Sequence, residues 1–278
     1  SKRTIKQKVT ILSVDTASEA YALSLAEKAK IDMPYMMELT GKSEQELFED
    51  LKGVIFLNPM HTSDEDGRPK YLPADEYLSG NVREKLEWAR RSAELYPEDY
   101  SENVRALEAV QPVDLTASEI SVRLGATWLP PEIAEQFMFE LFGTPRYCQW
   151  NIHVHFSQYT GEWNVEGKSY DRTNVKAYNT YGTSRINGYK IMEETLNLKD
   201  VRIFDYIEDE NGKKTAVLNK KETAIAQGKQ ELIKQAFADW IWEDPERREK
   251  LTRLYNEKFN STRPREYDGS HMSFVGIN

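Results

Sequence analysis

The fold class is decided by residues 150–165, which read WNIHVHFSQYTGEWNV. Apolar and polar side chains alternate from Trp150 to Phe156, which predicts a half-buried β-strand with Trp150 on its core face. Turn residues at 159–162 then reverse the chain, and a second strand returns at 163–165. This stretch therefore predicts an antiparallel β-hairpin.

The chain after this hairpin combines helices with one more hairpin. Asn211-Gly212 favours a tight turn between two strands, because both residue types tolerate the left-handed backbone conformation. Asp244-Pro245 predicts a helix start, with Asp as N-cap and Pro at the first helical position. The expected elements are a helix at 184–196, strands at 201–207 and 215–218, helices at 221–242 and 244–259, and an aperiodic tail at 261–278.

The chain before residue 110 reads as a series of short helices. Apolar residues at helical spacing predict the first helix within 16–30. Asp32 offers an N-cap and Gly41 a stop for the second helix, and Ser43 with Glu46 forms a capping box for the third. Further expected elements are a strand at 54–57, an acidic loop at 61–70, and helices at 81–95 and 100–110.

Residues 116–142 resemble a helix-turn-helix. Thr116 and Glu119 form a capping box that predicts a helix through Leu124, Gly125 lies in the turn, and Pro130-Pro131 opens a second helix through Phe142. The second helix carries three glutamates and no Lys or Arg, so DNA phosphates would repel it. We therefore interpret this segment as a helical hairpin that contributes to the core.

Charge is distributed unevenly along the 278 residues. The chain has 37 Lys and Arg against 46 Asp and Glu, a net charge of −9, and residues 1–145 account for 16 and 26 of these, respectively. A predominantly α-helical α+β fold is predicted, and any phosphate contact is expected in the second half. The expected regions are an acidic helical part at 1–145, a β-hairpin and helix part at 146–260, and a linker-like tail at 261–278.

The sequence predicts no catalytic residue, metal site or cofactor. It contains no phosphate-binding loop, no dinucleotide-binding glycine motif and no nucleophile elbow. A single cysteine, Cys148, excludes an internal disulfide and favours a reducing, cytoplasmic location. His153 and His155 share one strand face, but no third metal ligand is indicated, so we interpret them as solvated polar residues. Neither a secretory signal nor a membrane-spanning segment is expected.

One segment combines cations with aromatic residues in a way that suits nucleic acid. Cations can pair with phosphates, and aromatic rings can stack on bases. The alternative is that the aromatic rings pack internally while acids at 162–200 weaken the positive field. The candidate DNA-binding residues are Trp163, Lys168, Arg172, Lys176, Tyr178, Arg185, Lys190 and Arg202.

Several long phrases of this sequence resemble one protein family. They are ADEYLSGNVREKL at 74–86, LGATWLPPEI at 124–133, SRINGYKIMEETLNL at 184–198, and the last sixty residues from NKKETAIAQGKQELIKQ onward. They are similar to the region between the two enzymes in large proteins of bacterial conjugative elements and phages. Those proteins fuse an adenine-specific DNA methyltransferase to a Swi/Snf-type superfamily-two helicase.

The resemblance implies a non-catalytic fragment of a larger enzyme. In the family, the nucleotide-binding loop of the helicase motor lies beyond the YDGSH phrase at 267–271, so the tail is expected to lead into a motor that is absent here. The implied role is to couple the two enzymes or to position DNA, and the implied partners are DNA and the adjacent methyltransferase and helicase domains. The alternative is a purely structural protein–protein docking module without DNA contact.

Overall fold

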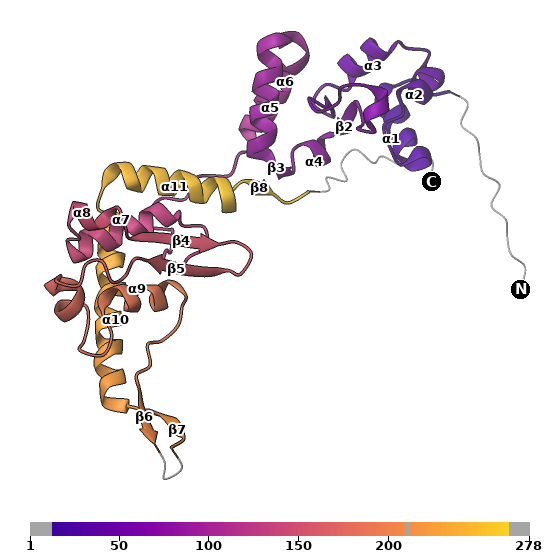
Figure 1. Ribbon diagram of the computed structural model, residues 1–278. Coiled ribbons are helices and arrows are strands. Elements are labelled where there is room, and N and C mark those ends of the chain that lie inside the picture. The colour runs from indigo at the N-terminus through magenta and orange to yellow at the C-terminus, as the bar shows by residue number, and fades with distance from the viewer. Residues whose placement is uncertain (1–12, 209–211, 267–278) are drawn as a thin grey trace, which may run out of the picture. The chain divides into compact units, whose positions relative to one another are not determined.

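The computed structural model of the chain describes residues 13–208 and 212–266 (Figure 1). Internal contacts divide them into two units. Unit 1 contains the described residues up to Asp114 and those from Glu257 onward, and unit 2 spans Leu115–Asn256. The predicted helix-dominated α+β fold is confirmed, because every sheet is a two-stranded antiparallel pair among many helices. Within the described residues, no helix combines the length and apolar character that crossing a bilayer requires.

The expected boundary near residue 145 is wrong. Phe142 and Thr144 are 1% and 5% exposed, so the chain around them lies inside a core and not in a linker. The tail is also not wholly linker-like, because Thr262–Arg263 (β8) pairs with Gly80–Asn81 (β3) in unit 1. Residues 267–278 of the expected tail lie outside the described residues.

Unit 1 begins with three helices followed by an antiparallel strand pair. Local signals fix the helix ends as expected: Asp32 caps the second helix at its N-terminus, Gly41 ends it in the left-handed conformation, and Ser43 with Glu46 caps the third. The two strands pair across the loop at 58–70, which contains a short 3₁₀ turn. The elements are α1 (Ala17–Lys28), α2 (Met33–Thr40), α3 (Glu44–Asp50), β1 (Ile55–Leu57) and β2 (Tyr71–Pro73).

The rest of unit 1 is a helical hairpin with a separate small core. Leu86 and Leu107 pack its two long helices together, and Asn103 donates hydrogen bonds to the Tyr77 hydroxyl at 2.9 Å and the Leu57 carbonyl at 2.8 Å. The C-terminal segment returns here, since Arg83 donates to the Asn260 carbonyl at 2.9 Å. The elements are α4 (Ala74–Tyr77), β3, α5 (Val82–Leu95), α6 (Pro97–Ala109) and β8.

Unit 2 contains one large core beneath a β-hairpin. Phe137 lies edge-on to Phe237 at 5.1 Å, and Phe142 lies edge-on to Tyr189 at 4.8 Å between ring centroids, which joins helices distant in sequence. The expected hairpin at 150–165 is present, but its first strand begins only at His153. The elements are α7 (Pro131–Phe142), α8 (Arg146–Gln149), β4 (His153–Ser157), β5 (Glu162–Glu166), the π-helical turn η2 (Lys176–Thr180) and α9 (Gly188–Leu196).

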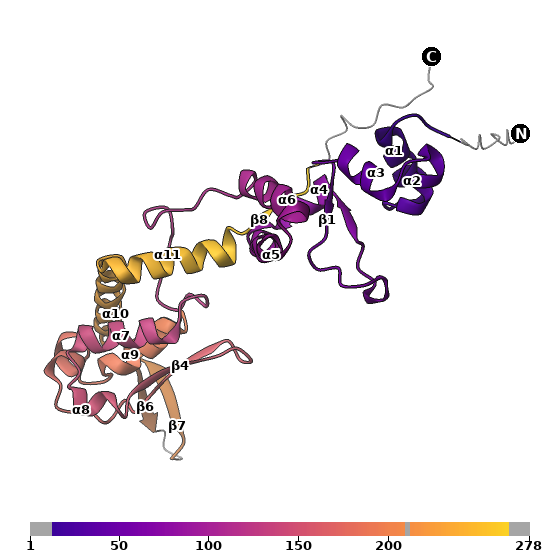
Figure 2. The same ribbon diagram turned by 90° about the horizontal axis from the view of Figure 1, so that it is seen from above.

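Two long helices and a second hairpin complete unit 2. The hairpin extends away from the core in both views (Figures 1 and 2), and nine of its ten strand residues are exposed. Its expected turn residues at 209–211 lie outside the described residues. The elements are β6 (Phe204–Glu208), β7 (Lys214–Leu218), α10 (Lys220–Trp240) and α11 (Pro245–Phe259), whose last residues from Glu257 belong to unit 1.

The expected helix-turn-helix at 116–142 does not form. Thr116 and Glu119 make part of the capping box, with Thr116 donating from its amide at 2.8 Å, yet residues 116–124 continue as turns and extended chain. The segment instead uses Ile120 and Leu124, which are 5% and 3% exposed, as buried side chains without helical structure. Only the second expected helix, α7, is present.

Candidate nucleic-acid interface

Two acid-poor segments of unit 2 lie side by side. Residues 141–161 contain no Asp or Glu, and residues 167–192 contain only Asp171. Asn174 donates to the Phe142 carbonyl at 3.0 Å, and the Cys148 thiol lies 3.7 Å from the Tyr170 carbonyl oxygen. Contact is so close at residue 167 that a Cβ there would lie 1.8 Å from the Asn151 carbonyl oxygen, so only glycine fits.

A buried carboxylate anchors the second segment. Asp171 is 2% exposed and accepts hydrogen bonds from the Tyr189 hydroxyl at 2.7 Å and the Asn174 amide at 2.6 Å. The Tyr189 hydroxyl also lies 2.7 Å from Thr144 Oγ1, which ties the two segments together. Since Asp171 points inward, its neighbours Tyr170 and Arg172 are exposed to solvent.

The tyrosine and the cysteine of this buried network resist ionisation. Burial raises the pKa of the Tyr189 hydroxyl far above its ordinary value, so it remains a neutral donor. Burial and the negative charge of Asp171 raise the pKa of the Cys148 thiol, which disfavours the reactive thiolate. The network therefore has the chemistry of a rigid support for the surface above it.

Exposed aromatic and cationic side chains gather on the two segments. The aromatic rings are strongly exposed: Tyr147 at 73%, Trp150 at 82% and Tyr170 at 63%. Exposed rings beside cations can stack on unpaired bases while the cations contact phosphates. We call this set the aromatic–cationic surface; it consists of Arg146, Tyr147, Trp150, Tyr170, Arg172 and Lys176.

Of the eight residues expected from sequence to contact DNA, two belong to this surface. Arg172 and Lys176 are exposed, and within the described part of the chain neither has an acidic partner. Arg202 is also exposed but lies on a separate segment, between Val201 and Ile203, whose amides donate to side chains of α10.

The other five residues have partners within the chain, and for Trp163 its burial contradicts the sequence-based prediction. Trp163 is 3% exposed and packs on Phe156 at 4.8 Å, so its ring cannot stack on a base. Tyr178 is half-buried against the core, and Arg185 pairs with Asp205 at 2.8 Å. The remaining two, Lys168 and Lys190, both bind one carboxylate.

That carboxylate, Glu193, is a structural ion-pair centre. Its oxygens lie 2.5 Å from each of the Lys168 and Lys190 ammonium groups, and it accepts from the Val165 amide at 2.9 Å. Burial raises its pKa, but the hydrogen bonds from the two lysines and the amide outweigh burial, so its pKa is lowered overall. Glu193 and Lys168, which donates to the Val165 carbonyl at 2.7 Å, therefore hold α9 against β5, whereas Lys190 pairs with Glu193 within α9.

Four residues of the surface are not among the eight predicted from sequence: Arg146, Tyr147, Trp150 and Tyr170. The alternation at 150–156 assigns Trp150 to the core, but its backbone is right-handed helical at the end of α8, which turns the ring outward. The sequence feature that could have indicated this surface is the absence of Asp and Glu from residues 141–161.

The two strand histidines contact carboxylates individually. His153 Nδ1 lies 3.5 Å from Glu135 and His155 Nε2 lies 3.5 Å from Glu166. Among the residues that the structure describes, no group of three or more His, Cys, Asp or Glu has the arrangement of a metal site.

Unit 1 presents a contrasting, acidic surface. Its order of three helices and an antiparallel pair joined by the loop at 58–70 is that of a winged helix, with α3 in the recognition position. That helix reads EQELFED, and residues 13–65 hold 11 acids against 4 Lys and Arg. A helix with this charge is repelled by the phosphates that flank a major groove.

Two family models match parts of the chain. Residues 13–65 match the family model described as "Probable helicase, winged helix domain", which supports a helicase-associated region. Residues 123–261, half of the chain, match the family described as "Domain of unknown function (DUF8437)", and the chain belongs to this family. Neither the comparison with curated proteins nor that with solved structures gives a match.

Proposed function

We propose that this chain is a non-catalytic, DNA-positioning part of a larger helicase, and that the aromatic–cationic surface contacts single-stranded DNA. The observation that carries the proposal is that the aromatic–cationic surface combines three strongly exposed aromatic rings with three exposed cations, on two segments whose single acid, Asp171, is buried. Single-strand binding uses this chemistry, because every base has a face that can stack.

The finer parts of the proposal follow from the resemblance. The parent protein combines an adenine-specific DNA methyltransferase with a Swi/Snf-type motor, as in the phage and mobile-element proteins that this sequence resembles. Methyl transfer and ATP hydrolysis then belong to those neighbouring domains, and this chain needs no cofactor of its own. Its role is to hold the strand in register between the two enzymes.

The proposal is tested by measuring the affinity of the full chain for a fluorescent oligo(dT) strand at several salt concentrations. A single strand loses about 0.7 of a logarithmic unit in affinity per contacted phosphate for each tenfold rise in salt. Changing Arg172→Gln and Lys176→Gln together is therefore expected to reduce the salt slope by about 1.4.

The matched control changes Lys220→Gln and Lys221→Gln, two exposed lysines of α10, which removes the same charge elsewhere in unit 2. The control is expected to keep most of the affinity and the slope. Equal losses in both double variants, or no binding of oligo(dT) by the unmodified chain at low salt, would contradict a specific DNA surface.

A second function, protein docking, is favoured by the acidic recognition helix. Glu49 and Asp50 of α3 are exposed, and a net charge of −7 over residues 13–65 suits a basic partner. We expect unit 1 to bind the motor encoded in the same reading frame, with Glu49→Lys and Asp50→Lys weakening the complex and steepening its dissociation in salt. A reading frame without a motor, or an unchanged complex, would reject docking through α3.

A further inference from the structure

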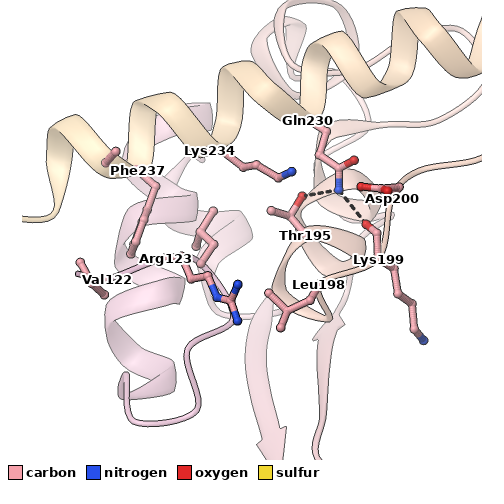
Figure 3. A pocket seen from close by; sticks show the side chains of 11 residues that line it. Val122, Arg123, Thr195, Leu198, Lys199, Asp200, Gln230, Lys234 and Phe237 are labelled. Carbon is pink, nitrogen blue, oxygen red and sulfur yellow. Dashed lines mark hydrogen bonds between the residues drawn. The ribbon is translucent and has the colours of Figure 1, made fainter.

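Unit 2 contains a pocket that the proposed function does not use. It has a volume of about 350 Å³ and lies between the turn at 122–125, the C-terminal end of α9 and the middle of α10 (Figure 3). This volume falls within the range of small-molecule sites. The residues that matter for its chemistry are Arg123, Thr195, Leu198, Gln230, Lys234 and Phe237.

The floor of the pocket is rigid and its polar groups are satisfied. Gln230 is 2% exposed, and its amide donates to the Lys199 carbonyl at 2.8 Å and to Thr195 Oγ1 at 3.2 Å (Figure 3). The Gln230 oxygen accepts from the Val201 amide at 3.2 Å. The end of α9 is therefore fixed against α10 without a ligand, so the pocket is preformed.

Leu198 is strained at the rim of this pocket. Its φ of 58° is left-handed, at the position after α9 where glycine is normally preferred. Hydrogen bonds from the Leu198 amide to the Thr195 carbonyl at 3.0 Å and from the Lys199 amide to the Glu194 carbonyl at 2.9 Å hold the backbone there. The side chain remains 57% exposed, so burial in the core does not offset the strain. Backbone strain of this kind concentrates at functional sites.

Two cations reach into the pocket from opposite walls. The Lys234 ammonium extends from α10 toward Thr195, and the Arg123 guanidinium is directed toward Leu198, whereas the Lys199 ammonium points away (Figure 3). Arg123 is exposed and has no acidic partner within the described residues.

The acids near these cations neutralise them only in part. Lys234 lies 2.7 Å from Glu231, whose side chain is 69% exposed, and such solvent-exposed pairs are weak. Asp200 also lines the pocket and is exposed. Counting Arg123, Lys199 and Lys234 against Asp200 and Glu231, the net charge around the pocket is +1.

We propose that this pocket binds a small organic phosphomonoester. The phosphate accepts charge-assisted hydrogen bonds from Arg123 and Lys234, and the apolar body of the ligand packs on the exposed Leu198 and on the half-buried Val122, which also lines the pocket. A phosphate of a nucleic-acid backbone would use the cations but leave the exposed leucine without a contact. The pocket is therefore assigned to a free small molecule, and this assignment does not depend on DNA binding by the aromatic–cationic surface.

The test is a methyl NMR titration of the full chain with three probes: phenyl phosphate, inorganic phosphate and benzyl alcohol. Phenyl phosphate is expected to shift the methyl signals of Leu124 and Leu198 and to bind at least tenfold more tightly than either other probe. Arg123→Gln is expected to weaken phenyl phosphate about tenfold, the effect of losing one charge-assisted interaction. Arg248→Gln, an exposed arginine of α11, is the matched control and is expected to change nothing.

Leu198→Gly removes the apolar contact with the ligand without destabilising the fold, because glycine relieves the backbone strain at this position. It is expected to weaken phenyl phosphate several-fold and to leave inorganic phosphate unaffected. The proposal is overturned if phenyl phosphate shifts neither leucine, if inorganic phosphate binds equally well, or if Arg123→Gln and Arg248→Gln behave alike. The same three probes can be used whether or not oligo(dT) binds. The phosphomonoester site and the DNA-binding surface can therefore be disproved independently of each other.

Discussion

Tyr189→Phe removes one oxygen atom from the buried support of the aromatic–cationic surface. The hydroxyl lies 2.7 Å from both Asp171 and Thr144, and the side chain is fully buried, so no water replaces it. The ring and its edge-on contact with Phe142 are retained. The variant therefore tests the hydrogen bonds and not the packing.

The expected loss in the free energy of unfolding is about 2 kcal/mol. A hydrogen bond to a charged acceptor contributes about 1.5–3 kcal/mol, and Asp171 keeps its bond from Asn174 at 2.6 Å, so the carboxylate is not left without partners. With a urea m-value of about 2 kcal/mol/M, the unfolding midpoint moves down by roughly 1 M.

Tryptophan fluorescence during urea unfolding measures this change in unit 2, because five of the six tryptophans lie between residues 128 and 242. The control is Tyr206→Phe, on the exposed hairpin at 73% exposure, which is expected to stay within about 0.5 kcal/mol of the unmodified chain. Equal midpoints for Tyr189→Phe and Tyr206→Phe would refute the reasoning that Asp171 and Tyr189 support this surface.

Three further predictions concern stability. Gly125→Ala is expected to lower the free energy of unfolding by about 3 kcal/mol or more in the same urea assay. The reason is that φ is +88° and that a Cβ would lie 2.2 Å from the Leu196 carbonyl oxygen. An unchanged free energy of unfolding would contradict this close approach. Leu198→Gly is expected to stabilise unit 2 by about 1 kcal/mol by removing left-handed strain, and a destabilised variant would show that its side chain is needed for folding. Burial raises the pKa of Tyr77 to about 12, so the stability of unit 1 is complete below pH 10, where the tyrosine is neutral in both states, and falls by up to about 3 kcal/mol from pH 10 to 12. Urea unfolding followed by circular dichroism measures this fall, which Tyr77→Phe should reduce.

Local signals predicted most helix ends. Asp32, Gly41 and the Ser43–Glu46 box act within one helical turn, so the sequence alone determines α2 and the start of α3. The capping box at Thr116 shows the limit of such signals. Thr116 donates to the Glu119 carboxylate, so part of the box forms, but a short helix is marginal on its own, and burial of Ile120 and Leu124 in a turn-rich path takes precedence.

The candidate interface was harder to predict because its charges are decided by distant partners. Glu193 lies 25 residues from Lys168 in sequence, and no local pattern indicates that it binds both Lys168 and Lys190. The similarity of residues 13–65 to a winged helix was missed for a similar reason. The helices and β1 were expected, but β2 was not, and without the β1–β2 pair the elements do not define a wing.

Ultraviolet cross-linking of the full chain to oligo(dT), with the attached residues identified by mass spectrometry, tests the central claim most directly. We expect cross-links at Tyr147, Trp150 and Tyr170, and we expect them to disappear as salt is raised. Cross-links confined to α3 or to the β6–β7 hairpin would contradict the account, since DNA would then be bound by a surface other than the aromatic–cationic one.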